Sequence, residues 1–259
     1  MNELTSPEYW DSKYAGGETP EDINPADFRQ RPYRALIEKV ESLGLHNKKV
    51  LEIGAGGSAV LTCLAARNSG AEFHGLDYSE AGCRRLEELA LRRGAGVKAH
   101  HADLFSPPES LKGRFDIVYS LGVAEHFESL ASVAKAQAFF LAPGGLMLTV
   151  VPNLSGVIGA LVRRYAPGIM ALHKVYDAPA LLAGHAEAGL EPLSAGYLCS
   201  TNFGAISSCF KSDKDPGWRA YLWLSRLSKA VWFFEDTLFP LPATRRYSAY
   251  VCAVSRSRP

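Results

Sequence analysis

Short apolar runs alternate with longer stretches of helical periodicity between residue 34 and about residue 195 of the chain. The apolar runs are rich in β-forming residues, which predicts strands. The five predicted strands cover residues 49–55, 72–78, 97–103, 115–121 and 146–152. The helical patterns between or before them cover residues 33–45, 59–70, 81–94 and 132–145, and each ends near a glycine. This alternation predicts a parallel sheet covered by helices.

The rhythm changes after Pro152. An amphipathic stretch follows at 157–170, and the pattern at 177–190 predicts another helix. Two further strands are predicted at 191–200 and 248–255. We find no internal repeat and no low-complexity tract in the chain, and we expect a single core.

The segment from Thr201 to Arg246 lies between the two final strands and is too long for a hairpin loop, so we expect an insertion or a cap. Its middle, from Trp218 to Phe239, is helical in period. The apolar residues that we expect on one packed side of this helix are Tyr221, Leu222, Leu224, Leu227, Val231 and Phe234.

Composition narrows the class of partner. The 259 residues include 28 Lys and Arg and 27 Asp and Glu, so the chain has almost no net charge that would attract a polyanion. We therefore expect it to act on a small molecule rather than on a nucleic acid. The five cysteines are scattered without a C-x-x-C pair, which argues against a disulfide framework and a zinc site and fits a reducing cytoplasm. No signal peptide and no membrane-spanning run is predicted, so we expect a cytoplasmic protein that is soluble or at most peripheral to a membrane.

The stretch VLEIGAGGSAVL, at 50–61, is a predicted strand that runs into a glycine-rich turn and then a helix. Such a turn lets backbone approach a ligand at the carboxyl end of a parallel strand, here at Gly54 and Gly56. Three carboxylates fall at the same edge of consecutive strands: Glu52, Asp77 and Asp103.

The two later acids suit different parts of an adenosine ligand. A carboxylate at Asp77 can accept hydrogen bonds from both ribose hydroxyls, and one at Asp103 can accept from an adenine amino group. The third glycine of the dinucleotide pattern G-x-G-x-x-G is absent, with Ser58 and Ala59 near its place, so we expect a ligand without a pyrophosphate.

These motifs resemble those of class I S-adenosylmethionine-dependent methyltransferases, and among them the ubiquinone-biosynthesis O-methyltransferase-like small-molecule enzymes. The resemblance covers residues 45–153 and departs from many members at Ser58, where they have glycine. It rests, in order, on EIGAGGS, GLDYS, HADLF, FDIVYSLGVAEHF and LAPGGLMLTVVPN.

The resemblance implies a Rossmann-like α/β fold with a seven-stranded, mostly parallel sheet, helices on both faces and a last strand antiparallel to the others. We expect residues 1–44 to form an N-terminal helical lid and residues 201–244 a helical cap inserted before the last strand. Residues 45–200 and 245–259 are then the core that binds S-adenosylmethionine.

The resemblance also implies roles for single residues. Asp77, with Tyr78 beside it, is expected to hold the ribose, Asp103 with Leu104 the adenine, and Ser120 with Leu121 the methionine part. The turn of Gly54, Ala55 and Gly56 is expected to pass beneath the cofactor, oriented by Glu52. In the lid, the predicted contacts are the rings of Tyr9, Trp10 and Tyr14 against the sulfonium, and Arg31 against the cofactor's carboxylate. Each of these roles has a structural alternative: the acids at the strand ends could cap helices, the aromatic rings could pack on the core, and Arg31 could be a surface arginine.

Methyl transfer requires a positioned acceptor, exclusion of water and often the removal of one proton. His126, after the fourth predicted strand, is our candidate base, and a histidine that only stabilises the loop is the alternative. His100 and His101 are adjacent on one strand and face opposite sides, so they cannot form a two-histidine site, and we predict no metal.

Acceptor-binding residues are expected after the fifth strand and in the insertion. The candidates are His173, Tyr176, Asn202 and Phe203, with Trp223 and Trp232 as further residues that could line or close the pocket. For His173 and Tyr176 the alternative is a role at the start of the next helix, with Asp177 as N-cap.

The sequence favours an enzyme that methylates a small, fairly apolar acceptor. We rank an oxygen atom first as the methylated atom, sulfur second and nitrogen third. The alternative of another class is a protein with the same fold that binds the cofactor or a membrane without turnover. The helix in the insertion could pack over the acceptor, which we favour, against a second subunit in a homodimer, or on a membrane surface.

Overall fold

The structure is a computed structural model that describes residues 23–210 and 212–258. The predicted contacts of Tyr9, Trp10 and Tyr14 lie outside these residues, as does half of the predicted lid. None of the helices in the described parts of the chain is both long enough and apolar enough to cross a membrane.

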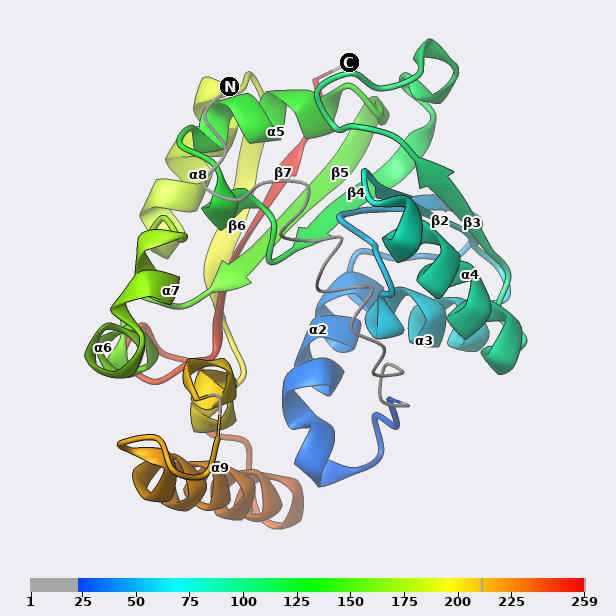
Figure 1. The fold of residues 1–259 in the computed structure, drawn as a ribbon. Helices are drawn as coiled ribbons and strands as arrows, with labels where there is room; N and C mark the ends of the chain where they lie inside the picture. The colour runs from blue at the N-terminus through cyan, green and yellow to red at the C-terminus, as the bar shows by residue number, and fades with distance from the viewer. Residues whose placement is uncertain (1–22, 211, 259) are drawn as a thin grey trace.

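A seven-stranded sheet forms the centre of the molecule, in the order β3-β2-β1-β4-β5-β7-β6 (Figure 1). The strands are β1 (Lys49–Ile53), β2 (Glu72–Asp77), β3 (Val97–His101), β4 (Phe115–Leu121), β5 (Leu141–Pro152), β6 (Glu191–Leu198) and β7 (Tyr250–Arg256). β7 runs antiparallel to both of its neighbours, and the other paired strands are parallel. The predicted fold class is confirmed.

Helices cover both faces of this sheet. They are α2 (Arg31–Glu41), α3 (Ala59–Arg67), α4 (Glu80–Arg93), α5 (Leu130–Ala138) and α8 (Ala178–Glu187). Side chains alternate between the faces, so Val50 packs with α2, α3 and α4, whereas its neighbour Leu51 packs with α5 and α8. Serine N-caps begin three of the helices: the hydroxyls of Ser58, Ser79 and Ser129 accept backbone N–H bonds at the starts of α3, α4 and α5.

A third apolar cluster lies beyond the carboxyl ends of β5 and β6. It is built by α6 (Val157–Tyr165), α7 (Pro167–Ala171), the 3-10 helix η4 (Phe203–Cys209) and α9 (Trp218–Thr237). In Figure 1, α9 lies at the lower edge of the molecule, next to α2 and the short 3-10 helix η1 (Phe28–Gln30). Both segments that interrupt the alternation therefore sit at the edge of the sheet where the glycine turn lies.

Two details of the predicted elements were wrong. The helix predicted over 132–145 ends at Ala138, and β5 begins already at Leu141. Residues 142–145 bulge out of the pairing with β4, so an apolar, helix-like pattern here belongs to a strand end.

The second correction concerns the packed side of α9. Leu227 and Phe234 were expected on that side but are exposed, whereas Ser228 and Glu235 are buried there. Both polar residues have partners inside: the hydroxyl of Ser228 accepts from the backbone N–H of Phe203, and Glu235 pairs with Arg31.

Candidate cofactor site

The turn after β1 needs glycine at Gly54. Its φ is +73°, which strains any other residue, and a Cβ at this position would lie 2.5 Å from Cγ2 of Val123 and force that side chain to move. The backbone N–H groups of Gly54 and Ala55 both donate to the carbonyl oxygen of Leu76, which ties the turn to β2. The sequence VLEIGAGG thus folds into a tight turn held against the neighbouring strand.

Glu52, two residues before Gly54, is hydrogen-bonded to the elements next to the same turn. Its carboxylate accepts a 2.6 Å hydrogen bond from the hydroxyl of Tyr119 and a 3.0 Å bond from the hydroxyl of Ser58, the N-cap of α3. Burial raises the pKa of Glu52 to about 7, although these two hydrogen bonds act in the opposite direction. Glu52 therefore links β1, β4 and the start of α3 through one buried carboxyl group.

Asp77, at the end of β2, is buried beside the turn. One carboxylate oxygen accepts from the backbone N–H of Gly56 at 2.7 Å and the other from that of Ser79 at 2.8 Å. The side chain predicted to hold a ribose is thus fixed against the glycine turn by two backbone groups.

A cavity of about 450 Å³ opens above the turn, in the size range of small-molecule sites. Glu52, Gly54, Gly56 and Leu121 are the predicted cofactor residues that line it. The other lining residues are Tyr33, Leu36, Gly57, Ser58, Ala59, Val60, Gly122, Val150, Val151, Pro152 and Tyr250. A largely apolar cavity over turn backbone, with the buried carboxyl group of Glu52 in its lining, fits an adenosine-containing ligand such as S-adenosylmethionine.

The other predicted cofactor residues, Asp77 among them, do not line this cavity. Ala55 and Leu104 are buried in the core, and Tyr78 is partly buried. Asp103 is exposed and accepts from the backbone N–H of Phe105. Ser120 is fully buried, and its hydroxyl has no hydrogen-bond partner among the described residues.

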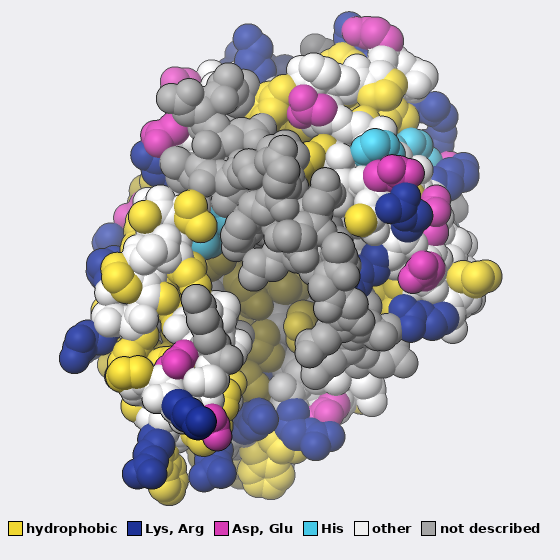
Figure 2. Space-filling model, in the orientation of Figure 1, with side chains coloured by type: hydrophobic (Ala, Val, Ile, Leu, Met, Phe, Trp, Pro, Cys, Tyr) yellow, Lys and Arg dark blue, Asp and Glu magenta, His cyan; other side chains and the backbone are white. Residues whose placement is uncertain are grey.

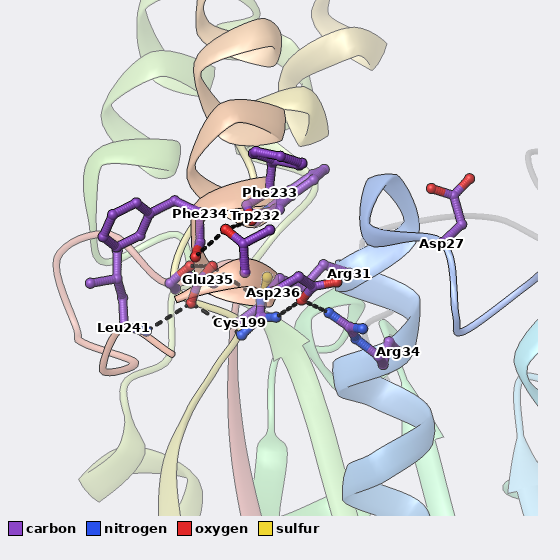
Figure 3. Close-up of polar contacts among 12 residues, drawn as sticks. Asp27, Arg31, Arg34, Cys199, Trp232, Phe233, Phe234, Glu235, Asp236 and Leu241 are labelled. Atoms are coloured by element: carbon purple, nitrogen blue, oxygen red, sulfur yellow. Dashed lines mark hydrogen bonds and ion pairs between the residues drawn. The ribbon is translucent and has the colours of Figure 1, made fainter. Parts of the chain in front are cut away.

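Arg31 is placed away from the cavity. Its guanidinium pairs with Glu235 at 3.1 Å and with Asp236 at 2.7 Å, both on α9. Figure 3 shows Arg31 and Arg34 of α2 pointing together toward these two acids. Arg31 thus joins α2 to the insertion, and its predicted contact with the cofactor's carboxylate stays a prediction.

Sequence reasoning missed the two tyrosines of the cavity, Tyr33 and Tyr250. Tyr33 comes from α2, and Tyr250 lies beside Pro152 in the pairing of β7 with β5. Burial raises the pKa of Tyr250, and a hydrogen bond with the Asn202 side chain partly offsets that effect. Tyr250 could have been found from its position at the start of the final strand. Because that strand is antiparallel, its first residue lies at the edge where the parallel strands end.

His126 lies in the short 3-10 helix η3 (Ala124–His126) that follows β4. Its Nδ1 lies 3.1 Å from the carbonyl oxygen of Leu172, and a carbonyl only accepts, so Nδ1 carries the proton and donates. Burial, together with the nearby His173, lowers the pKa of His126 to about 4. The imidazole is therefore neutral at pH 7, with its lone pair on Nε2.

Glu125, His126 and His173 form one cluster, in which one ligand atom of each lies within 4.8 Å of the others. His173 also donates from Nδ1 to a backbone carbonyl, that of Ile169, at 2.7 Å. Burial raises the pKa of Glu125 to about 8, and its Oε2 has no partner among the described residues. These three side chains could hold a divalent cation, so the prediction of no metal stays untested.

His100 and His101 turn to opposite sides of β3, as predicted. The ring of His100 stacks on that of His74, with ring nitrogens 2.8 Å apart, whereas His101 donates to the carbonyl oxygen of Tyr78.

The candidate acceptor residues fall into separate groups. His173 and partly buried Tyr176 lie on the side of Glu125, whose charge adds to burial in raising the pKa of Tyr176. Asn202 and Phe203 begin η4 near Tyr250.

The two tryptophans of α9 differ in position. Trp232 is buried and donates from its indole to the carbonyl oxygen of Thr201. Trp223 is 71% exposed, so its expected place in a pocket was wrong. It lies on the outer side of the same helix.

Comparisons with known proteins agree on one class. A family model described as a methyltransferase domain matches residues 26–195. A ubiquinone biosynthesis O-methyltransferase of Pseudomonas aeruginosa is 33% identical over 159 residues, which are 58% of this chain and 68% of that one.

Solved structures share the fold at low identity. A putative sarcosine dimethylglycine methyltransferase from Galdieria sulphuraria aligns with a TM-score of 0.59 at 15% identity, over 97% of this chain and 98% of that one. A geranyl diphosphate C-methyltransferase from Streptomyces coelicolor, solved with S-adenosyl-L-homocysteine, aligns with a TM-score of 0.60 at 13% identity, over 96% and 97% of the two chains.

Proposed function

Because the chain belongs to the methyltransferase-domain family and is an S-adenosylmethionine-dependent methyltransferase, we propose that it methylates an oxygen atom of a small, fairly apolar acceptor. The observation that carries this proposal is the neutral, oriented imidazole of His126 at the end of β4, the strand whose Leu121 lines the cavity. The relative from Pseudomonas aeruginosa, whose name states O-methylation, supports the choice of oxygen.

We assign the cofactor to the cavity above the glycine turn. Gly54 and Gly56 offer it close backbone, Asp77 a carboxylate for the ribose, and Leu121 an apolar contact. The roles of Tyr78, Asp103, Leu104 and Ser120 are retained as part of this proposal. So is the division into a lid at 1–44, a core, and a cap at 201–244.

S-adenosylmethionine supplies an electrophilic methyl group on its sulfonium. The protein's own task is to hold the acceptor in line with it and to take up the hydroxyl proton. His126 can accept that proton at Nε2, because the carbonyl of Leu172 holds the Nδ1 proton in place. A thiol acceptor would ionise more easily and would need this help less.

The test replaces His126 by Ala. We expect cofactor binding to remain and the methylation rate of a phenolic acceptor to fall by roughly two to four orders of magnitude, the usual contribution of a general base. The rate is read as demethylated cofactor formed, against a panel of phenols, thiols, amines and carboxylates. His46→Ala, at an exposed histidine far from η3, serves as the matched control.

Two outcomes would contradict this role. An unchanged rate in His126→Ala between pH 6 and 9 would make the histidine structural or point to a thiol acceptor. A rate that a chelator abolishes and a divalent cation restores would instead assign Glu125, His126 and His173 as metal ligands.

A further inference from the structure

The outer side of α9 is apolar and exposed. Trp223, Leu227 and Phe234 are 71%, 51% and 37% exposed, and their spacing of four and seven residues places them on one side of the helix. Leu238 and Phe239 extend the exposed apolar surface just past the end of the helix. Scattered single apolar residues are normal on a surface, but a row of this kind marks an interaction site.

The charges of α9 are separated between its two sides. Its acids, Glu235 and Asp236, pair with Arg31 and Arg34 on α2 (Figure 3). Two of its basic residues, Arg219 and Arg226, are exposed on the side of Trp223 and form no ion pair with a carboxylate among the described residues. Lys229 faces η1 instead, where its charge adds to the hydrogen bonds of Arg29 in lowering the pKa of Asp27. The outer side therefore combines large apolar side chains with positive charge only.

Cationic and apolar side chains also meet in space. The guanidinium carbon of Arg226 lies 5.6 Å from the centre of the Trp223 ring. Figure 2 shows hydrophobic and basic side chains together along the lower edge of the molecule, where Figure 1 places α9.

We propose that the outer side of α9 docks on an anionic lipid surface, with Trp223, Leu227 and Phe234 inserted among the headgroups and Arg219 and Arg226 against lipid phosphates. Tryptophan, phenylalanine and leucine beside lysine and arginine are the composition of helices that lie in a membrane interface. Anionic headgroups attract such basic residues.

A second copy of the chain fits this surface less well. A two-fold interface places the same patch on both subunits, so Arg219 and Arg226 would face their own copies without acids to offset them.

The inner side of α9 gives such docking a consequence. The ion pairs of Arg31 and Arg34 fix α9 to α2, and α2 contributes Tyr33 and Leu36 to the cavity. A helix held on lipid through its outer side would therefore keep the wall of the cavity at a set position near the bilayer. The inference goes beyond the proposed function, because it does not depend on which atom is methylated.

The experiment is co-sedimentation of the full chain with phosphatidylcholine vesicles that contain 0 or about 30% phosphatidylglycerol. We expect binding to the anionic vesicles only, and weaker binding as salt rises toward about 1 M, because screening removes the electrostatic attraction. The emission of the exposed Trp223 should shift to the blue on binding, since its ring leaves water.

Variants separate the apolar and the electrostatic contributions. Trp223→Ser with Leu227→Ser should lower the partition coefficient at least tenfold, since two large apolar side chains no longer insert. Arg219→Gln and Arg226→Gln should each lower it about fivefold, the effect of about one basic residue near an anionic surface. Leu91→Ser and Arg92→Gln, on exposed positions of α4, are the matched controls and should change nothing.

Circular dichroism and thermal unfolding establish that each variant is folded. The proposal is overturned if the folded chain does not bind anionic vesicles, or if the α9 variants bind as well as the α4 controls. It is also overturned if sedimentation without vesicles shows a dimer that Trp223→Ser with Leu227→Ser dissociates, which would make a second copy the occupant.

Discussion

Glu52 illustrates how a single residue supports the candidate cofactor site from inside the core. Its carboxyl group is taken out of water, bonded by Tyr119 and Ser58, and placed beneath the glycine turn. Desolvation is the largest cause of its raised pKa, the two hydrogen bonds oppose it, and the charge of Asp77 adds to it. Because the folded state raises the pKa of this acid to about 7, its contribution to stability is complete below about pH 4.5 and is lost as the pH rises through 7.

Glu52→Gln should reduce this loss of stability with rising pH. The amide keeps an acceptor oxygen for Tyr119 and cannot ionise. The free energy of unfolding of the variant should therefore rise relative to that of the wild type as the pH goes from 5 to 8. The gain should be about 3 kcal/mol at most, since one pKa unit corresponds to about 1.4 kcal/mol. Urea unfolding at both pH values measures it. Glu88→Gln on the surface of α4 is the control, and parallel curves for Glu52→Gln and wild type would refute the raised pKa.

Residue-level prediction worked best where backbone geometry dictates the amino acid. Gly54 could be predicted from the sequence because a strand-to-helix turn at a positive φ requires glycine. Tyr33 could not be predicted as a cavity residue, because the sequence pattern of an amphipathic helix does not show whether a tyrosine faces the core, the solvent or a cavity. The partner of Arg31 was also hidden, since Glu235 lies 204 residues away along the chain.

At the level of elements, periodicity located α9 but not its orientation. Hydrophobicity favoured a packed side with Leu227 and Phe234, whereas the structure buries Ser228 and Glu235. A polar side chain can be buried when it has a partner, and pattern alone does not reveal a partner on another helix. The bounds of α9 were predicted to within two residues because its long periodic run is interrupted by nothing else.

The buried pair between α2 and α9 makes a prediction about stability. Glu235→Ala removes a fully buried carboxylate that Arg31, Ser200 and the backbone N–H of Leu241 all contact. It leaves these donors unsatisfied, so unfolding should become easier by about 3 kcal/mol.

Thermal or urea unfolding provides the measurement. As a control, Glu80→Ala breaks an exposed ion pair with Arg84 and should cost less than about 1 kcal/mol. Equal losses for the two variants would mean that the pair between α2 and α9 is not a buried one in solution.

For the whole molecule, the seven strands with an antiparallel last strand followed from the family resemblance, and the location of both insertions followed from the sequence. Parallel strands end at one edge, and the segments after β5 and β6 must therefore lie at the edge of the glycine turn. What did not follow was the early start of β5 at Leu141 and the grouping of Glu125, His126 and His173, which depends on how residues 153–177 fold back. Contacts of that kind arise only in three dimensions.

Replacing residues 212–239 by a short Gly/Ser linker tests the organisation of the molecule into core and cap. The cavity is lined by residues from α2, the sheet and its loops, so cofactor binding should remain within a few fold of the wild type. Turnover of the acceptor should be lost if the insertion covers the acceptor. Calorimetric titration with S-adenosyl-L-homocysteine and the methylation assay give the two readings. A shortened protein that turns over at the original rate would remove the cap from the proposed organisation.

The place of β7 between β5 and β6 has a consequence for synthesis of the chain. Among the described residues, β6 has hydrogen-bonded strand partners only in β7, whose residues 250–256 are made more than 50 positions later. Until then, residues 191–198 have an unpaired backbone, and the edge of β5 is open to the wrong neighbour. We therefore expect the nascent protein to depend on chaperones until β7 leaves the ribosome, and the finished sheet to form in one late step.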